Sequence, residues 1–143
     1  TVFHLRTITS SEILGQPALE GVHSDGVDHA MTVFLKSQNM SSDSAKTRVH
    51  HNDEQTGKPW DAVDPRFVIT EVQHRNRLDT LLVFDHERKH SVTPVQTIDD
   101  SFSATRDMLI FFTRKPTRQG HVSAEHDSQK PHQSMPAEVR LLD

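Results

Sequence analysis

The chain has 143 residues, of which 33% are hydrophobic and 25% are charged, and this size and composition predict one domain with a moderate core. Its net charge of −4, counted with histidine neutral, argues against nucleic acid as a partner, since phosphate binding needs an excess of Lys and Arg. The absence of cysteine excludes a disulfide framework, a zinc ribbon and a thiol nucleophile.

Nothing in the sequence predicts a membrane partner or an export signal. The chain has no run of about 18 apolar residues, the length that spans a bilayer. It starts with strand-like sequence instead of a charged segment followed by an apolar one, so we expect no signal peptide and a cytoplasmic location. Because that start is abrupt and lacks a methionine, we also expect the chain to be a piece of a longer protein.

Seven segments have the alternating or β-branched pattern of strands, and turn-rich or polar sequence separates them. They are residues 2–9, 28–38, 45–51, 67–72, 79–84, 90–95 and 106–114. Short strands with almost no helix between them favour an antiparallel sandwich or a jelly roll. A complete jelly roll needs about eight strands. The chain therefore supplies most of a barrel and little of what packs on its faces.

The sequence changes character near residue 116, where polar residues and prolines replace apolar ones. We therefore expect a jelly-roll core over residues 1–115 and a polar C-terminal tail over residues 116–143. Within that tail, only residues 137–143 favour a short helical turn.

Residues 86–90, HERKH, match the H-E-x-x-H signature of zinc peptidases, in which two histidines one helical turn apart flank a general base. That site requires a helix, because only a helix places residues i and i+4 on one face. Strand-like sequence precedes the motif, and Pro94 follows it closely, so a hairpin turn is favoured. A zinc hydrolase that uses His86, Glu87 and His90 is the least favoured alternative.

A second constellation comes from two H-x-D sequences, His23-x-Asp25 and His51-x-Asp53. In extended backbone, residues i and i+2 point to the same side, so such a pair can bind one metal together. Composition alone predicts about one pair of this kind. Only His23 and Asp25 lie in a turn that leads into an apolar strand, residues 28–38. With a second histidine, they would form the facial triad of non-haem Fe(II) oxygenases, which leaves open coordination positions.

His90 is the preferred third ligand, because it starts a predicted strand directly after the apolar strand 79–84. A site of His23, Asp25 and His90 would take two ligands from one bend and one from a distant strand. The rivals, which have poorer strand contexts, are His29, His50, His74 and His86.

Arg106 opens the predicted strand over residues 106–114, and a buried arginine there needs a carboxylate partner. A dicarboxylate co-substrate would supply that partner through a bidentate contact, whereas a surface Arg106 would pair with Asp107 or Asp100. The residues alone leave both alternatives open. Because side chains alternate along a strand, Ile110 and Phe112 lie on the same side as Arg106, either as the wall of a substrate pocket or as plain core.

With these residues in view, the chain resembles the 2-oxoglutarate/Fe(II) dioxygenases that act on free amino acids, of the L-isoleucine dioxygenase type. The matching pieces are FHLR at 3–6, GQPALEGVHSDGVD at 15–28, DTLLVFDHERKHSVTPV at 79–95 and ATRDMLIFFT at 104–113. The resemblance covers roughly residues 2–115, and the linked set is more specific than the triad alone. It implies a mainly β fold, the double-stranded β-helix of jelly-roll and cupin-like proteins.

The resemblance also implies the chemistry of the site. The residues that it assigns to iron are His23, Asp25 and His90. It assigns Arg106 to the distal carboxylate of 2-oxoglutarate, and we expect Ile110 and Phe112 to position the substrate. The implied activity uses Fe(II), 2-oxoglutarate and O2 to oxidise an aliphatic C–H of an amino acid such as valine, isoleucine or leucine. The outcome is hydroxylation or, as in some fungal members, closure of an aziridine ring.

The family domain normally continues before this segment with helices and further strands that are missing here. The resemblance therefore implies a jelly roll without its N-terminal bracing part. The expected partners are a small-molecule amino acid substrate and an associated N-terminal fragment of the same protein. The main alternative from another class is a non-catalytic β-barrel binding module whose histidines are ordinary surface residues.

Overall fold

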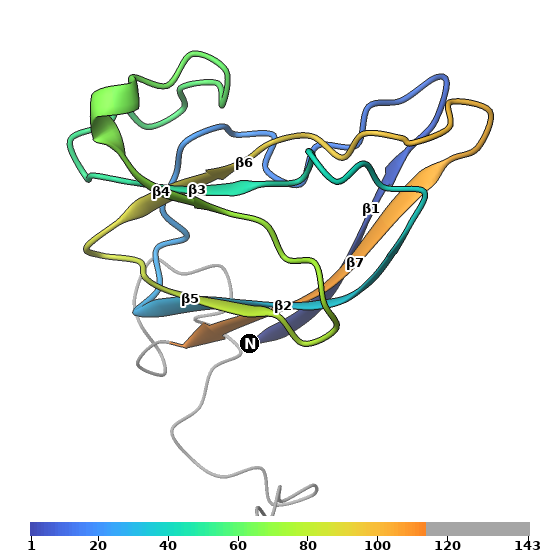
Figure 1. Cartoon of the computed structure of the whole chain (residues 1–143). Helices are drawn as coiled ribbons and strands as arrows, with labels where there is room; N and C mark the ends of the chain where they lie inside the picture. Colours follow the sequence, from blue (N-terminus) through green and yellow to red (C-terminus); the bar gives the residue numbers. More distant parts are fainter. Residues whose placement is uncertain (114–143) are drawn as a thin grey trace, which may run out of the picture. The chain divides into compact units, whose positions relative to one another are not determined.

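The structure is a computed structural model, and it describes residues 1–113 of the chain. Within that range, seven strands form two antiparallel sheets that lie one above the other (Figure 1). The larger sheet has the order β1 (Val2–Thr9), β7 (Ala104–Thr113), β2 (His29–Gln38) and β5 (Thr80–Phe84). The smaller sheet has the order β4 (Val68–Val72), β3 (Thr47–His50) and β6 (Lys89–Val92).

All seven predicted strands are present, so the mainly β fold predicted from the sequence is confirmed. The one helical element in residues 1–113 is a short 3-10 helix, η1 (Pro65–Phe67). The predicted tail over 116–143, with its helical turn over 137–143, lies outside the described residues, so the division of the chain stays a prediction. In the described part, no helix has the length and apolar character needed to cross a membrane. The cytoplasmic location also stays a prediction.

The register of the larger sheet decides which side chains face the smaller sheet. β7 pairs with β1 and β2, and Met108 lies opposite Leu5 on one side and Phe34 on the other. Met108 and Phe34 are buried, whereas Leu109, the next residue along β7, is only partly buried. Because side chains alternate along a strand, Arg106 shares the inward face with Met108.

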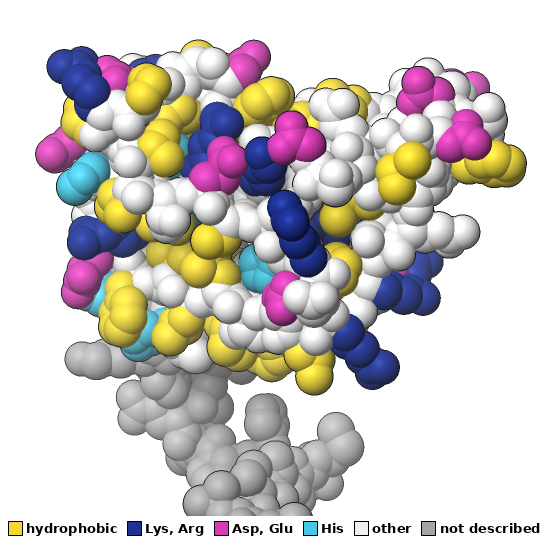
Figure 2. Space-filling view, in the orientation of Figure 1, with side chains coloured by type: hydrophobic (Ala, Val, Ile, Leu, Met, Phe, Trp, Pro, Cys, Tyr) yellow, Lys and Arg dark blue, Asp and Glu magenta, His cyan; other side chains and the backbone are white. Residues whose placement is uncertain are grey.

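The outer face of the larger sheet has a different character. Val2, Leu82 and Phe84 are 57%, 51% and 47% exposed there. Figure 2 shows hydrophobic side chains along the lower margin of the molecule, where Figure 1 places this sheet. The same face carries one tightly bound acidic group, because buried Asp107 accepts hydrogen bonds from Nε and Nη2 of Arg6 at 2.7 and 2.9 Å.

Candidate active site

His23 and His90, which are distant in the sequence, meet through their backbones. The N–H of His23 donates to the carbonyl of His90 at 2.9 Å, and the N–H of His90 donates back at 2.9 Å. Residues paired in this antiparallel way project their side chains to one face. The two imidazole rings accordingly lie 4.3 Å apart, centroid to centroid. This isolated bridge lies on the edge of β6 that does not pair with β3.

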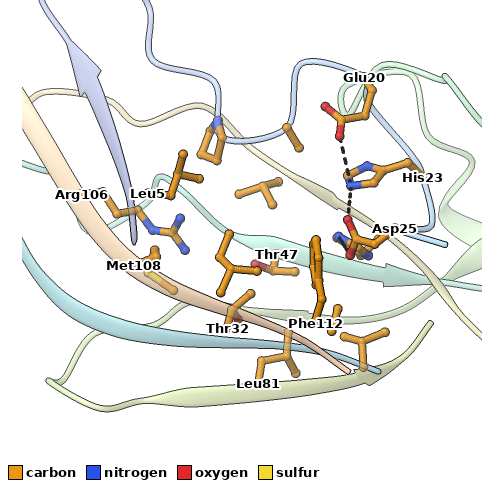
Figure 3. A pocket seen from close by; sticks show the side chains of 17 residues that line it. Leu5, Glu20, His23, Asp25, Thr32, Thr47, Leu81, Arg106, Met108 and Phe112 are labelled. Atoms are coloured by element: carbon orange, nitrogen blue, oxygen red, sulfur yellow. Dashed lines mark ion pairs between the residues drawn. The ribbon is translucent and has the colours of Figure 1, made fainter. Parts of the chain in front are cut away.

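Asp25 completes a cluster with these two histidines (Figure 3). Its Oδ1 lies 3.6 Å from Nε2 of His23, and its Oδ2 lies 3.6 Å from Nε2 of His90. One ligand atom from each residue lies within 4.8 Å of the other two. In residues 1–113, this is the sole group of three or more His, Asp or Glu side chains close enough to hold a metal ion. The donor set of two imidazoles and one carboxylate suits Fe(II).

The hydrogen bond of the His23 ring leaves its Nε2 free for a metal. Nδ1 of His23 lies 2.8 Å from the carbonyl of Gly21, and a proton there leaves the lone pair on Nε2 facing Asp25. Burial opposes protonation of His23, but hydrogen bonds to Asp25 and Gly21 and nearby carboxylates outweigh it and raise its pKa. Burial and then the adjacent His23 lower the pKa of His90. A metal cation that binds these ligands takes the place of the proton that they would otherwise hold.

Asp85 holds the turn that carries Asp25. Its side chain is 2% exposed and accepts hydrogen bonds from three consecutive backbone N–H groups. The distances are 2.8 Å from Asp25, 2.7 Å from Gly26 and 3.0 Å from Val27. Gly26 has a φ of +75°, which permits the tight turn that aims all three donors at one carboxylate. The sequence interpretation missed this role, because Asp85 lies in a charged run assigned to a hairpin turn.

The change Asp85→Asn is expected to weaken Fe(II) binding by about 10- to 100-fold, the usual effect of losing a group that orients a metal ligand. The amide keeps one acceptor, but its NH2 group faces backbone donors and cannot replace the second carboxylate oxygen. An anaerobic titration with Fe(II) measures the affinity, and circular dichroism confirms that the variant is folded. The matched control is Asp53→Asn, which alters the exposed aspartate of the other H-x-D pair. Equal affinities for both variants would contradict the role of Asp85.

A cavity of about 200 Å³ lies between the two sheets and contains the His-Asp-His cluster. Figure 3 shows His23 and Asp25 at one end of it and Arg106 at the other. Much of the wall between them is apolar, and residues from both sheets contribute to it. Ile110 and Phe112 are part of that wall, on the side of β7 that the alternation predicts.

Arg106 faces the cavity without a carboxylate partner. It is 4% exposed, and among residues 1–113 its side chain makes no hydrogen bond or ion pair. Burial alone lowers its pKa to about 10, which leaves it positively charged at neutral pH. Asp107 points to the opposite face and binds Arg6, and Asp100 binds Thr97. The alternative of a surface Arg106 paired with either aspartate is therefore wrong, and the cavity favours an anionic ligand.

The H-E-x-x-H residues form a turn, as the sequence predicts, and not a helix. Residues 85–88 connect β5 to β6, and His90 lies within β6. His86 is exposed and lies outside the cluster that contains His90. Its Nε2 is 3.7 Å from Oε1 of Glu87. Without a helix, the two histidines do not converge as a zinc peptidase requires.

The other rival histidines have partners elsewhere, and none joins the cluster. Nδ1 of His29 lies 2.8 Å from the hydroxyl of Thr113. Nε2 of buried His50 lies 2.9 Å from the hydroxyl of Ser91. Nε2 of His74 lies 3.2 Å from the hydroxyl of Thr32. The second H-x-D pair, His51 and Asp53, also stays outside the cluster.

Known proteins provide an independent comparison. Residues 1–112 match the model of the family described as 2OG-Fe dioxygenase. The chain is 50% identical over 140 residues to the protein named "Bifunctional enzyme flvA" from Aspergillus flavus. It is 47% identical to a selenomethionine-labelled structure of the Fe(II)/(alpha)ketoglutarate-dependent dioxygenase TqaL, with a TM-score of 0.81. The likeness to that structure confirms the predicted jelly-roll fold.

Two more distant structures share the fold. They are IDO from Bacillus thuringiensis, at 20% identity and a TM-score of 0.61, and a bsmA homologue from Methylobium petroleophilum PM1, at 23% and 0.59. Each of these two matches covers 80% of the chain, against 98% for flvA and 96% for TqaL. The chain in turn covers 17% of flvA, 48% of TqaL, 47% of IDO and 40% of the bsmA homologue. It therefore spans less than half the length of each of these relatives.

Proposed function

The chain belongs to the 2OG-Fe dioxygenase family, and on that premise we propose that it oxidises an aliphatic C–H of a free amino acid. Enzymes of this family use Fe(II), 2-oxoglutarate and O2. The observation that carries the proposal is the joint occurrence, in one cavity, of a His-Asp-His cluster and a buried arginine with no partner. A metal cation and a dicarboxylate are the two ligands that these features need.

In this proposal, His23, Asp25 and His90 hold the iron through the two Nε2 atoms and one carboxylate oxygen. The three side chains converge on one point, and the Gly21 carbonyl fixes the ring of His23. When bound, Fe(II) together with 2-oxoglutarate and O2 supplies an oxidant able to remove hydrogen from an aliphatic carbon, while 2-oxoglutarate becomes succinate and CO2. The residues themselves hold and orient these groups.

Arg106 is proposed to bind the distal carboxylate of 2-oxoglutarate. A guanidinium forms two parallel hydrogen bonds to a carboxylate, and this contact is strong where water is excluded. Arg106 is suited to this contact, because it is buried away from water and its side chain has no competing partner among residues 1–113. Its position across the cavity from His23 and Asp25 leaves room for a small dicarboxylate between the arginine and the metal (Figure 3).

The apolar wall supports an aliphatic substrate, and Ile110 and Phe112 are proposed to position its reacting carbon. Small misplacements of reacting atoms change rates strongly, so this wall also influences the product. Transfer of a hydroxyl group to the carbon gives an alcohol. If the amine nitrogen lies closer to that carbon, closure of an aziridine ring replaces hydroxylation.

We further propose that the outer face of the larger sheet binds another segment of the same protein. Val2, Leu82 and Phe84 expose an apolar surface there, and such surfaces mark interaction sites. The chain covers 48% of the TqaL chain. A protein as long as TqaL would therefore contain about as much polypeptide again, and that part is proposed to cover this face. Mass spectrometry of the protein from its natural source should therefore find the N-terminal segment associated with it. Purification of this chain alone would contradict the proposal.

The proposed activity is tested with the intact protein, Fe(II), ascorbate, 2-oxoglutarate and a panel of aliphatic amino acids. Mass spectrometry should detect succinate and an amino acid product that gains 16 Da by hydroxylation or loses 2 Da by ring closure. The variant Glu87→Gln should retain activity within about twofold, because Glu87 is exposed and outside the cavity. Loss of activity in that variant would support the zinc hydrolase. Folded, metal-loaded protein that neither binds 2-oxoglutarate nor forms a product would support the binding module.

A further inference from the structure

Glu20 is an acidic side chain beside the proposed metal site. Its Oε1 lies 3.3 Å from Nε2 of His23, the atom that would bind iron (Figure 3). Glu20 also lines the cavity, yet its side chain is 57% exposed, against 13% for His23 and 16% for Asp25. It therefore reaches from the mouth of the cavity toward the proposed metal.

The backbone fixes Glu20 relative to His23. Gly21 lies between them with a φ of +74°, and a Cβ built there would lie 2.3 Å from the carbonyl oxygen of Lys58. That carbonyl also accepts a hydrogen bond of 2.9 Å from the N–H of Val22. Only glycine fits such a close approach at a positive φ. The short loop before His23 is thus held against the segment that contains Lys58.

The proposed ligands leave Glu20 as the one charged side chain of the cavity, among residues 1–113, that has no assigned role. Asp25 binds the iron, and Arg106 binds 2-oxoglutarate. Iron bound at Nε2 of His23 would take the place of this contact between Glu20 and His23. A carboxylate then lies at the cavity directly beside the reacting centre, where it can receive a cationic group of a ligand.

We propose that Glu20 binds the protonated amine of the substrate and thereby selects amino acids over analogues that lack the amine. This inference rests on the proposed function. A charge-assisted hydrogen bond between ammonium and carboxylate is one of the stronger polar contacts available to a small ligand. Because Glu20 contacts a ligand of the metal, an amine bound to it places the adjacent carbons beside the iron.

A different role for Glu20 would be that of a fourth protein ligand to the iron. The facial triad leaves three coordination positions open. When bound, 2-oxoglutarate and O2 would need these open positions. A fourth protein ligand would block one of these, so binding the substrate amine is the role compatible with the reaction.

The test uses the intact protein with Fe(II) and 2-oxoglutarate under anaerobic conditions. Addition of L-valine and of 3-methylbutanoate, its analogue without the amine, is followed through changes in the visible charge-transfer band. The unmodified protein should respond to L-valine at a concentration at least tenfold lower than the concentration of 3-methylbutanoate that gives the same response. Glu20→Gln should raise the half-saturating concentration of L-valine about 10- to 100-fold and remove the preference over 3-methylbutanoate. Its affinities for Fe(II) and 2-oxoglutarate should stay within about twofold.

Two control variants sharpen the result. Glu20→Asp retains the negative charge and should restore part of the preference for L-valine. Glu87→Gln removes an equally exposed glutamate outside the cavity and should change nothing. The inference is overturned if Glu20→Gln leaves L-valine binding unchanged or weakens Fe(II) binding instead. It is also overturned if the unmodified protein shows no preference for L-valine over 3-methylbutanoate. The proposed function fails separately, if no charge-transfer band forms at all.

Discussion

Replacing His90 with alanine is expected to weaken Fe(II) binding more than about 100-fold, since the loss of groups that merely orient a ligand already costs 10- to 100-fold. The charge-transfer band of the Fe(II) complex with 2-oxoglutarate should disappear with it. The fold should persist, because His90 is joined to His23 through backbone atoms that alanine retains. Anaerobic titration with Fe(II) and visible spectroscopy measure both effects.

The matched control for this variant is His86→Ala, which alters the other histidine of the same H-E-x-x-H sequence. His86 lies on an exposed turn outside the cavity, so Fe(II) affinity and the band should be unchanged. If His86→Ala abolished metal binding and His90→Ala did not, the assignment of the third ligand would be wrong.

The second large effect is expected for Arg106→Ala, which should weaken 2-oxoglutarate binding by about 30-fold to several thousand-fold. This range corresponds to about 2–5 kcal/mol for truncating one partner of a buried, hydrogen-bonded charge pair. Fe(II) affinity should change little, because Arg106 lies across the cavity from His23 and Asp25. Isothermal titration of the Fe(II)-loaded, oxygen-free protein with 2-oxoglutarate measures the loss.

Thermal stability distinguishes this role of Arg106 from a structural one. A buried guanidinium without a carboxylate partner is a cost to the fold, so Arg106→Ala should melt at the same or a higher temperature without ligands. Arg106→Lys keeps the charge but loses the planar fork, and its 2-oxoglutarate affinity should lie between those of the alanine variant and the unmodified protein. Arg66→Ala removes a highly exposed arginine and serves as the control. A lower melting temperature with unchanged 2-oxoglutarate affinity would contradict the proposed role.

The strands could be predicted from sequence because alternation and β-branched residues are local signals. Their ends depend on pairing: β7 begins at Ala104, opposite Thr9 of β1, two residues before the predicted start. β6 ends at Val92, short of the predicted 90–95, and Pro94, which has no N–H for a ladder, follows closely.

The site was predictable to a different degree for each residue. The i and i+2 spacing of His23 and Asp25 is a local signal, but their meeting with His90 depends on a bridge that only the folded sheet provides. Alternation placed Ile110 and Phe112 beside Arg106 without deciding which face of β7 is inward. The register with β1 and β2 decides that, and it shows Asp107 on the opposite face, bound by Arg6.

Asp85 and Glu20 were missed because their partners are set by tertiary structure. The carboxylate of Asp85 binds backbone donors about sixty positions earlier in the chain, at Asp25, Gly26 and Val27. Glu20 lies in a loop whose Gly and Pro residues indicate only a turn. An acidic residue within a turn is a common sequence feature, so neither position carries a signal of its own.

The most direct test of the central claim is a crystal structure of the intact protein with Fe(II) and 2-oxoglutarate, grown without oxygen. Anomalous scattering should place one iron between His23, Asp25 and His90. The distal carboxylate of 2-oxoglutarate should form paired hydrogen bonds with Arg106. Iron bound at other residues, or 2-oxoglutarate bound away from Arg106, would contradict the account.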